Sequence, residues 1–225
     1  SSEMTNILFD IISIQGSING GAEFTFRVLE ELITLKNIRI IGLYDSNIEF
    51  IEKDLDFYHQ KLSNVIDINQ SESISHIIGQ EQIDTFFIGI AQRYFEYNLE
   101  NIFCKTVIVI HDIGDIETYD NKISMLWKKE KRFQLKLFPQ KAKKTPYDNY
   151  QKLILFCEQP NVNIITVSDY SQSSILYYFP QLSSKKIDIL YPPMRKITIE
   201  ESIENDTLRK FFTHRQILFF AFKHT

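Results

Sequence analysis

Hydrophobic residues along this chain gather in short runs rich in Ile, Val, Leu and Phe, and a polar turn follows each run. Runs of about four to eight such residues, bounded by turn residues, are typical of β-strands. The runs that begin near Ile7, Thr106 and Asn163 are apolar at successive positions, which indicates strands covered on both faces. The pattern predicts strands at Ile7–Ser13, Ile38–Tyr44, Asn64–Ile68, Asp84–Ile90, Thr106–Ile110, Asn163–Val167, Ile187–Tyr191 and Gln216–Phe222.

Segments with helical spacing of apolar residues lie between these runs. They predict helices at Ala22–Leu35, Asn47–Lys61, Ser71–Gln80, Tyr94–Ile102, within Asp120–Cys157, and at Ser171–Tyr178 and Ile203–Thr213. Strand and helix alternate along the chain, which predicts an α/β protein with a doubly wound, Rossmann-like parallel sheet. Such sheets bind ligands beyond the carboxyl ends of their strands, so the loops after Ser13, Ile90, Ile110 and Val167 are expected to hold the functional residues.

The alternation is interrupted at Pro192 and Pro193, because two prolines cannot continue a central strand. Residues 1–193 are therefore expected to form one domain. Residues 194–225 are expected to form a linker and the first strand of a second, truncated domain. Since no helix follows that last strand to cover it, we expect the natural protein to continue beyond Thr225.

Composition is that of a globular protein and says little about partners. The 25 Lys and Arg residues against 29 Asp and Glu give a net charge of -4, which supplies no overall attraction to nucleic acid or to an anionic membrane. Cys104 and Cys157 lie far apart, without metal-ligand or redox spacing, which favours two small buried residues in a reducing compartment. No secretory signal and no apolar run of roughly 20 residues is visible, so a cytoplasmic location is expected. The richness in Ile, Asn and Lys favours a bacterial source.

Paired glycines, Gly20 and Gly21, end the loop after the first predicted strand and stand directly before a predicted helix. Glycines at this place let backbone N–H groups and the positive end of a helix dipole approach an anionic or polyhydroxylated ligand. The spacing is neither that of a dinucleotide fingerprint nor that of a Walker phosphate loop. Two interpretations stay open: a ligand-binding loop, and a turn that merely permits the strand and helix to pack.

A polar cluster from His111 to Glu117 follows the predicted strand Thr106–Ile110. Histidine can hydrogen-bond hydroxyls or phosphate, and a carboxylate such as Asp112 can bind hydroxyls or act as a base. The competing interpretation is a capping cluster at the start of the next helix, where acidic residues are common. No metal-ligand triad has a suitable spacing, so no metal is expected.

Basic residues dominate the segment Lys128–Lys144, where Glu130 is the single acid and aromatic residues are interleaved. Such a segment can lie on an anionic bilayer, and it would also fit nucleic acid. A solvated face is the commonest explanation of a charge run. We predict an exposed segment in peripheral contact with the inner face of an anionic membrane, and no nucleic-acid partner.

Several of these motifs together resemble the N-terminal domain of retaining GT-B glycosyltransferases, which transfer a sugar from a nucleotide sugar to a glycan, lipid or small acceptor. The resemblance covers most of the chain, and the run Gln216–Phe222 is similar to the opening strand of the second domain of that group. It is carried by Gly20-Gly21-Ala22-Glu23, Val109-Ile110-His111-Asp112, Ile164–Ser171 and Lys186–Pro193.

This resemblance implies a retaining, metal-independent transferase with no cofactor besides its nucleotide-sugar donor, and a glycan or lipid as acceptor. It implies that His111 approaches the transferring sugar as a catalytic residue. Gly20, Gly21, Asp112 and Ser168 would then bind substrate. The donor-binding residues of the group belong to the second domain, so the isolated chain is expected to be inactive.

Two other functions compete with this one. The first is a non-catalytic module that binds a glycan or a partner with the same fold. The second is a Rossmann oxidoreductase, which the glycine spacing disfavours, although Asp45 after the second predicted strand keeps it open.

Overall fold

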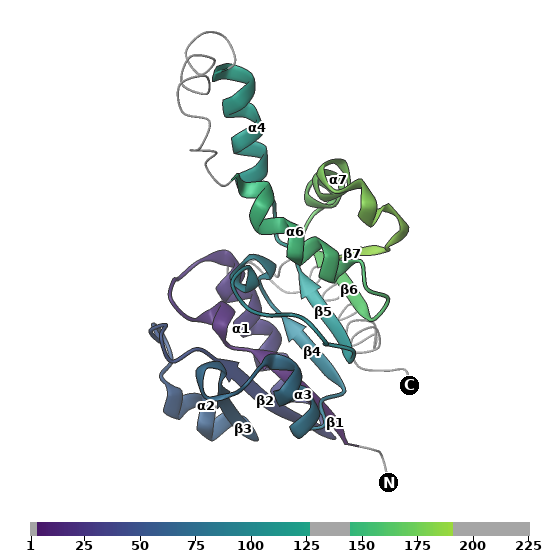
Figure 1. The fold of residues 1–225 in the computed structure, drawn as a ribbon. Coiled ribbons are helices and arrows are strands. Elements are labelled where there is room, and N and C mark those ends of the chain that lie inside the picture. The colour runs from purple at the N-terminus through teal and green to yellow at the C-terminus, as the bar shows by residue number, and fades with distance from the viewer. Residues whose placement is uncertain (1–3, 127–144, 191–225) are drawn as a thin grey trace, which may run out of the picture.

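The computed structural model describes residues 4–126 and 145–190, with backbone alone for 121–126. Within these ranges seven strands form one parallel sheet in the order β3-β2-β1-β4-β5-β6-β7 (Figure 1). The strands are β1 Thr5–Asp10, β2 Ile38–Tyr44, β3 Asn64–Asp67, β4 Thr85–Ile88, β5 Lys105–Val109, β6 Val162–Thr166 and β7 Ile187–Ile189.

The connections between these strands are mostly helical, as parallel pairing requires. They contain α1 Gly20–Ile33, α2 Leu55–Lys61, α3 Ile74–Gln80, α4 Gly114–Leu126, α6 Pro146–Cys157 and α7 Asp169–Tyr178. Shorter 3₁₀ helices occur at Ile12–Ile14 (η1), Ile68–Gln70 (η2), Ala91–Tyr94 (η3) and Pro180–Ser184 (η4). The chain moves outward from β1 over β2 and β3, then returns to β4 on the other side of β1. A crevice is expected where the order reverses, between the carboxyl ends of β1 and β4.

The central strand β1 is buried on both faces, as its unbroken apolar run predicts. Ile7 and Phe9 belong to the core cluster shared with α1 and α2, and Leu8 belongs to the cluster shared with α3, α6 and α7. Successive side chains of a strand point to opposite faces, so helices cover the sheet on both sides. Because helices cover both faces of the sheet, a ligand can approach it at the ends of the strands.

Helix α1 begins where its capping residue allows. The Asn19 side chain accepts a hydrogen bond from the Ala22 N–H at 2.8 Å, which satisfies one of the free donors of the first turn. From there Phe24, Val28 and Leu32 place apolar side chains in the core at helical spacing. The helix therefore runs from the carboxyl end of β1 back along the sheet.

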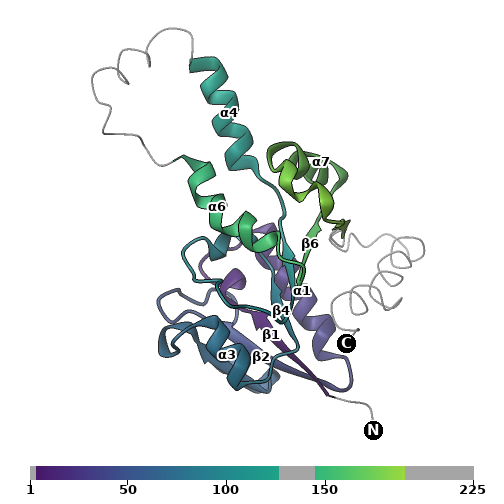
Figure 2. The same ribbon diagram turned by 45° about the vertical axis from the view of Figure 1, so that its right-hand side comes forward.

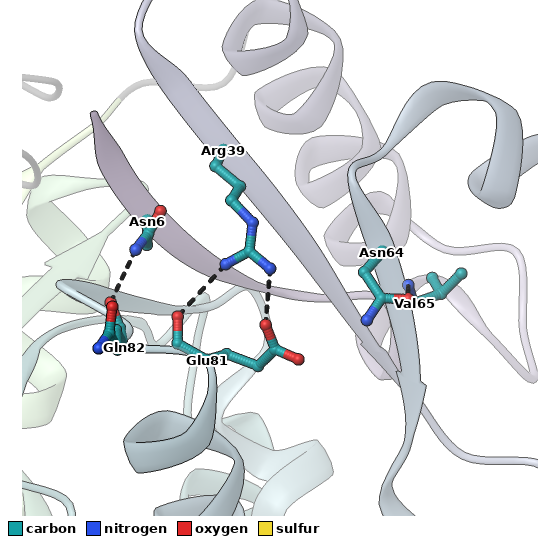
Figure 3. A network of polar contacts seen from close by, with 6 residues as sticks. All are labelled: Asn6, Arg39, Asn64, Val65, Glu81 and Gln82. Carbon is teal, nitrogen blue, oxygen red and sulfur yellow. Dashed lines mark hydrogen bonds and ion pairs between the residues drawn. The ribbon is translucent and has the colours of Figure 1, made fainter.

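Polar side chains fasten the amino edge of the sheet, opposite the crevice (Figure 3). The Arg39 guanidinium donates to the Glu81 carboxylate at 2.6 Å and to its carbonyl at 3.3 Å. The Asn6 amide donates to the Gln82 carbonyl at 2.9 Å. These contacts join β1 and β2 to the turn after α3.

Helix α4 extends beyond the carboxyl ends of the strands, and α6 leads from there back over the sheet, where its buried residues join the core (Figures 1 and 2). The Tyr147 hydroxyl of α6 donates to the Asp120 carboxylate of α4 at 2.9 Å. Among the described residues, no helix has the length and apolarity needed to cross a lipid bilayer.

The predicted α/β fold with a parallel sheet is confirmed, and seven predicted strands appear where the apolar runs stand. The predicted helix Tyr94–Ile102 is wrong: a 3₁₀ helix ends at Tyr94 and the chain then runs irregularly to β5. The predicted helix Asn47–Lys61 is shorter than expected and begins at Leu55, where Asp54 caps it.

Other predictions lie outside the described residues. They are the basic segment Lys128–Lys144, the strand Gln216–Phe222, the helix Ile203–Thr213 and the domain boundary after Pro193. They stay predictions.

Candidate functional site

A pocket of about 660 Å³, open to solvent, lies at the crevice where the strand order reverses. Its walls come from the loops and helix starts after β1, β4 and β5 and from the end of β6, as expected for a doubly wound sheet. The lining residues are Asn19, Gly20, Gly21, Glu23, Phe24, Arg27, Ile90, Gln92, Arg93, His111, Asp112, Asp115 and Val167.

The two glycines at the start of α1 have different environments. A Cβ at Gly21 would lie 2.8 Å from the Ile90 side chain, so Gly21 allows α1 to pack closely against the end of β4. A Cβ at Gly20 would have no atom within 4 Å. Neither glycine N–H has an acceptor among the described residues, because the first turn of a helix has none of its own and the Asn19 cap serves Ala22 and Glu23. Two residues that line the pocket therefore have backbone N–H groups without an acceptor in the described part of the chain.

A third glycine, Gly89, holds α1 at this position. A Cβ at Gly89 would lie 2.8 Å from the Thr25 Cβ and closer still to its Oγ1, so only glycine permits this approach. The Thr25 hydroxyl donates to the Gly21 carbonyl at 2.7 Å, and this bond keeps the side chain in place. The start of α1 is thus fixed against β4 by packing.

His111 stands at the end of β5 with one ring nitrogen engaged. Its Nε2 lies 2.8 Å from the Gly89 carbonyl oxygen, which can only accept, so Nε2 carries the proton. Burial lowers the pKa of the imidazole, although the bond to Gly89 and the nearby Asp112 carboxylate oppose this shift. The Phe24 ring meets the imidazole edge-on with centroids 5.1 Å apart. A neutral His111 therefore offers Nδ1 as a hydrogen-bond acceptor or proton acceptor.

The other wall of the pocket is the loop between β5 and α4. The Asp112 carboxylate accepts from the Gly114 N–H at 3.0 Å, so it satisfies one of the free donors in the first turn of α4. The Gln92 amide donates to the Asp112 carbonyl at 2.6 Å and to the Tyr150 hydroxyl at 3.1 Å. Tyr150 in turn donates to Asp115 at 2.8 Å. Asp112 therefore contacts the first turn of α4, as the competing interpretation of the acidic cluster expected, and it also lines the pocket.

Charges of both signs line the pocket, and they are not evenly distributed. Arg27 pairs with Glu23 at 3.0 Å on the second turn of α1, where both side chains are more than a third exposed. An exposed pair of this kind contributes little to stability, so Arg27 is available to a ligand. The carboxylates of Asp112 and Asp115 lie at the start of α4. The α1 side, where Arg27 balances Glu23, is consequently less negative than the α4 side, which carries two carboxylates.

Of the residues predicted from the sequence, Gly20, Gly21, His111 and Asp112 come together around this one pocket, and Ser168 does not line it. The Ser168 hydroxyl accepts from the Ser171 N–H at 3.0 Å and caps α7. Ligand roles for these residues remain predictions. Among the described residues, no group of three or more His, Cys, Asp or Glu side chains could hold a metal ion.

The sequence prediction pointed to the loop after Ile90 but named no residue in it. That loop supplies Gln92 and Arg93, and helix α1 supplies Phe24 and Arg27. Gln92 and Arg93, an amide and a cation, stand just after a buried strand, and this position is the signal by which the sequence could have identified them. Phe24 and Arg27 could not be identified in this way, because their place in the pocket depends on how α1 packs against the crevice, and that depends on the order of the strands in the sheet.

Comparisons with known proteins do not place the chain in a family. No protein-family model matches it, and a search of curated proteins finds no match. A solved structure that matches is a dodecameric FMN-dependent Ubix-like decarboxylase from Escherichia coli O157:H7. The identity is 12% and the TM-score 0.38, over 98% of this chain and 96% of that one. At these values the likeness assigns no function.

The expected retaining GT-B glycosyltransferase was wrong, since the enzyme found is a flavin-dependent decarboxylase and no comparison supports a transferase or a glycan-binding module. The predicted GT-B domain is not shown by any comparison, and the expectation of no cofactor is not supported either, since the matching structure belongs to an FMN-dependent enzyme. The physical reason is that the residues of these motifs have structural roles in packing and at helix starts. Gly21 permits α1 to pack against β4, Asp112 accepts from the first turn of α4, and Ser168 caps α7, so each has a structural role that needs no sugar substrate.

Proposed function

We propose that this protein binds a small phosphate monoester in the pocket at the crevice, with the phosphate at the start of α1. The observation that carries the proposal is that Gly20 and Gly21 line that pocket and that their N–H groups have no acceptor among the described residues. Donors at a helix start, together with the positive end of the helix dipole, form an anion-binding site. Arg27, one to two turns further along the same helix, adds a positive charge. Its ion pair with Glu23 is exposed and therefore weak, so the guanidinium can also contact a ligand.

The charge distribution sets the direction in which such a ligand lies. A phosphate beside Asp112 and Asp115 would meet two carboxylates, so the anionic end is expected at α1. The opposite end meets the Nδ1 acceptor of His111 and the carboxylates, all of which accept hydrogen bonds. The ligand should therefore carry hydroxyl or N–H groups at a distance from its phosphate.

Isothermal titration calorimetry of the full chain with FMN, AMP and inorganic phosphate tests this proposal. FMN is the ligand of the decarboxylase described above, but the expected result depends only on the phosphate group that the probes share. We expect at least one of the esters to bind more tightly than inorganic phosphate, because only the esters reach His111. No binding of any of the three would overturn the proposed function.

A pair of substitutions at Gly20 identifies the phosphate position. Gly20→Pro removes one N–H and leaves α1 intact, because proline suits the first helical position and Asn19 before it is extended. An N–H bond to an anion contributes about 1.5–3 kcal/mol, so binding should weaken by roughly tenfold or more. Gly20→Ala keeps the N–H and has space for its methyl group, so its affinity should stay within about twofold of wild type.

A charge-matched pair provides a second test. Arg27→Gln should weaken binding of the ester, whereas Arg39→Gln should not. Both arginines form a partly exposed pair with a glutamate, but Arg39 lies at the amino edge of the sheet (Figure 3). Equal effects of the two substitutions would show that overall charge, and not the pocket, determines binding.

A further inference from the structure

The half of the crevice that lies over β2 is closed by polar side chains. In doubly wound sheets that bind dinucleotides, an acid near the end of the second strand holds a ribose. Asp45 occupies that place here and is only 7% exposed. Its carboxylate accepts from the Tyr97 hydroxyl, from the Asn69 amide at 2.7 Å and from the Asn47 N–H at 2.8 Å. Both carboxylate oxygens of Asp45 therefore already accept hydrogen bonds from the protein, and the side chain is nearly inaccessible to a ribose.

Gln15 closes the same half from the loop after β1. Its amide nitrogen donates to the Asp45 carbonyl at 3.0 Å and to the Ile48 carbonyl at 2.9 Å, and its oxygen accepts from the Asp45 N–H at 2.9 Å. Gln15 is 1% exposed. The next residue, Gly16, donates its N–H to the Glu49 carbonyl at 3.0 Å. The loop after β1 therefore lies across the loop after β2.

Arg93 holds this closed arrangement from the β4 side. Its guanidinium donates to the Ile12 carbonyl at 3.0 Å and to the Gln15 carbonyl at 2.6 Å. Gly16 adopts a φ of 81°, and a Cβ there would lie 3.1 Å from the Arg93 guanidinium and 3.0 Å from the Ile48 side chain. The loop is thus confined on two sides, and no pocket-lining residue comes from the loops after β2 and β3 in the described part of the chain.

We infer that Gln15 and Tyr97 determine ligand size: they restrict the site to a single phosphate-bearing unit and exclude dinucleotides. This inference rests on the proposed function. A dinucleotide crosses the crevice and places one nucleoside on each side of it. Its second nucleoside would have to displace the buried bonds between Gln15, Asp45 and Tyr97. A monoester needs only the open half beside His111.

Calorimetry with matched probes tests this inference, with FMN against FAD and AMP against NAD. Each dinucleotide contains its partner as one half, so the comparison isolates the added nucleotide. We expect wild type to bind the monoester at least about tenfold more tightly than the matching dinucleotide. Gln15→Ala and Tyr97→Phe should reduce this ratio by about threefold or more, mainly through tighter binding of the dinucleotide.

Tyr147→Phe is the matched control for Tyr97→Phe, because it also removes a hydroxyl that donates to a carboxylate, but outside the pocket. It should leave the ratio unchanged. If Gln15→Ala does not fold, as circular dichroism would show, the wild-type ratio and Tyr97→Phe decide the question. Equal affinity of wild type for FMN and FAD, or AMP and NAD, would overturn the inference and leave the proposed function standing. Absence of binding by every probe would overturn both.

Discussion

Replacement of Asp10 by asparagine should destabilise the protein more than its small change in shape suggests. Asp10 ends β1 and has no exposed surface. Its Oδ1 accepts from the Ser13 N–H at 2.9 Å and from the Tyr94 hydroxyl at 2.6 Å. Its Oδ2 accepts from the Gly89 N–H at 2.9 Å and from the Ser13 hydroxyl. Each carboxylate oxygen therefore serves one backbone N–H and one hydroxyl.

Asn at this position can satisfy only part of this set. A hydroxyl can rotate and accept from the new amide NH₂, but a backbone N–H can only donate. In either orientation of the amide, the N–H of Ser13 or of Gly89 then faces a second donor. A buried donor left without an acceptor costs about 1–3 kcal/mol, and the lost bond to a charged group adds to this. We expect Asp10→Asn to lower the free energy of unfolding by about 2–4 kcal/mol.

The direction of the pKa shift at Asp10 adds a pH dependence. Burial raises this pKa, although the four hydrogen bonds oppose the shift. The folded state therefore holds the Asp10 proton more tightly than the unfolded state. The resulting stabilisation is present below the unfolded pKa near 3.8 and is lost as the pH rises through the folded value. A protonated carboxyl still accepts from an N–H, so asparagine is the poorer residue in both states, and the difference should be larger at acidic pH.

Urea unfolding followed by circular dichroism measures the difference, with Tyr94→Phe as control. That control removes one hydroxyl bond to a charged group and leaves both N–H bonds to Asp10 with their acceptors, so it should cost about 1.5–3 kcal/mol, less than Asp10→Asn. If Asp10→Asn costs no more than Tyr94→Phe, the two backbone N–H bonds do not stabilise the fold as argued.

Two further predictions concern the pocket walls. Burial lowers the pKa of His111 below 6.5, so the folded state disfavours the charged imidazole. The contribution of neutral His111 to stability is therefore complete above that pH and is lost as the pH falls through the folded pKa. His111→Gln retains a donor for the Gly89 carbonyl, and it should remove this part of the pH dependence when unfolding is compared at about pH 5 and about pH 7.5. Gly89→Ala should cost about 2–3 kcal/mol or more in urea unfolding, because its methyl group meets Thr25 and α1 must shift. Gly79→Ala, in α3 with no atom near its Cβ position, should instead stabilise the protein by about 0.4–1 kcal/mol, and a similar loss at both glycines would contradict the packing argument.

The sequence by itself determined the class of the fold, because the signals for it are local. Apolar runs such as Ile7–Phe9 and Thr106–Ile110 identify buried strands within a few residues, and the helical spacing between them requires parallel crossovers. The same reasoning placed Gly20 and His111 in loops that follow predicted strands, and the structure brings both into one pocket. Residues in the loops that follow strands could therefore be predicted as members of the site.

Only the tertiary structure decided how the crevice is divided. Tyr94 and Tyr97 belonged to an apolar pattern that predicted a helix, but their hydroxyls donate to Asp10 and Asp45, which are distant in the sequence and close in space. Gly89 falls within the predicted strand Asp84–Ile90, and only the structure shows that Thr25 of α1 packs directly against it. Such contacts depend on which strands are neighbours in the sheet, and the periodicity of one segment contains no information about the order of the others. The pocket and its closed half are consequences of placing β4 beside β1.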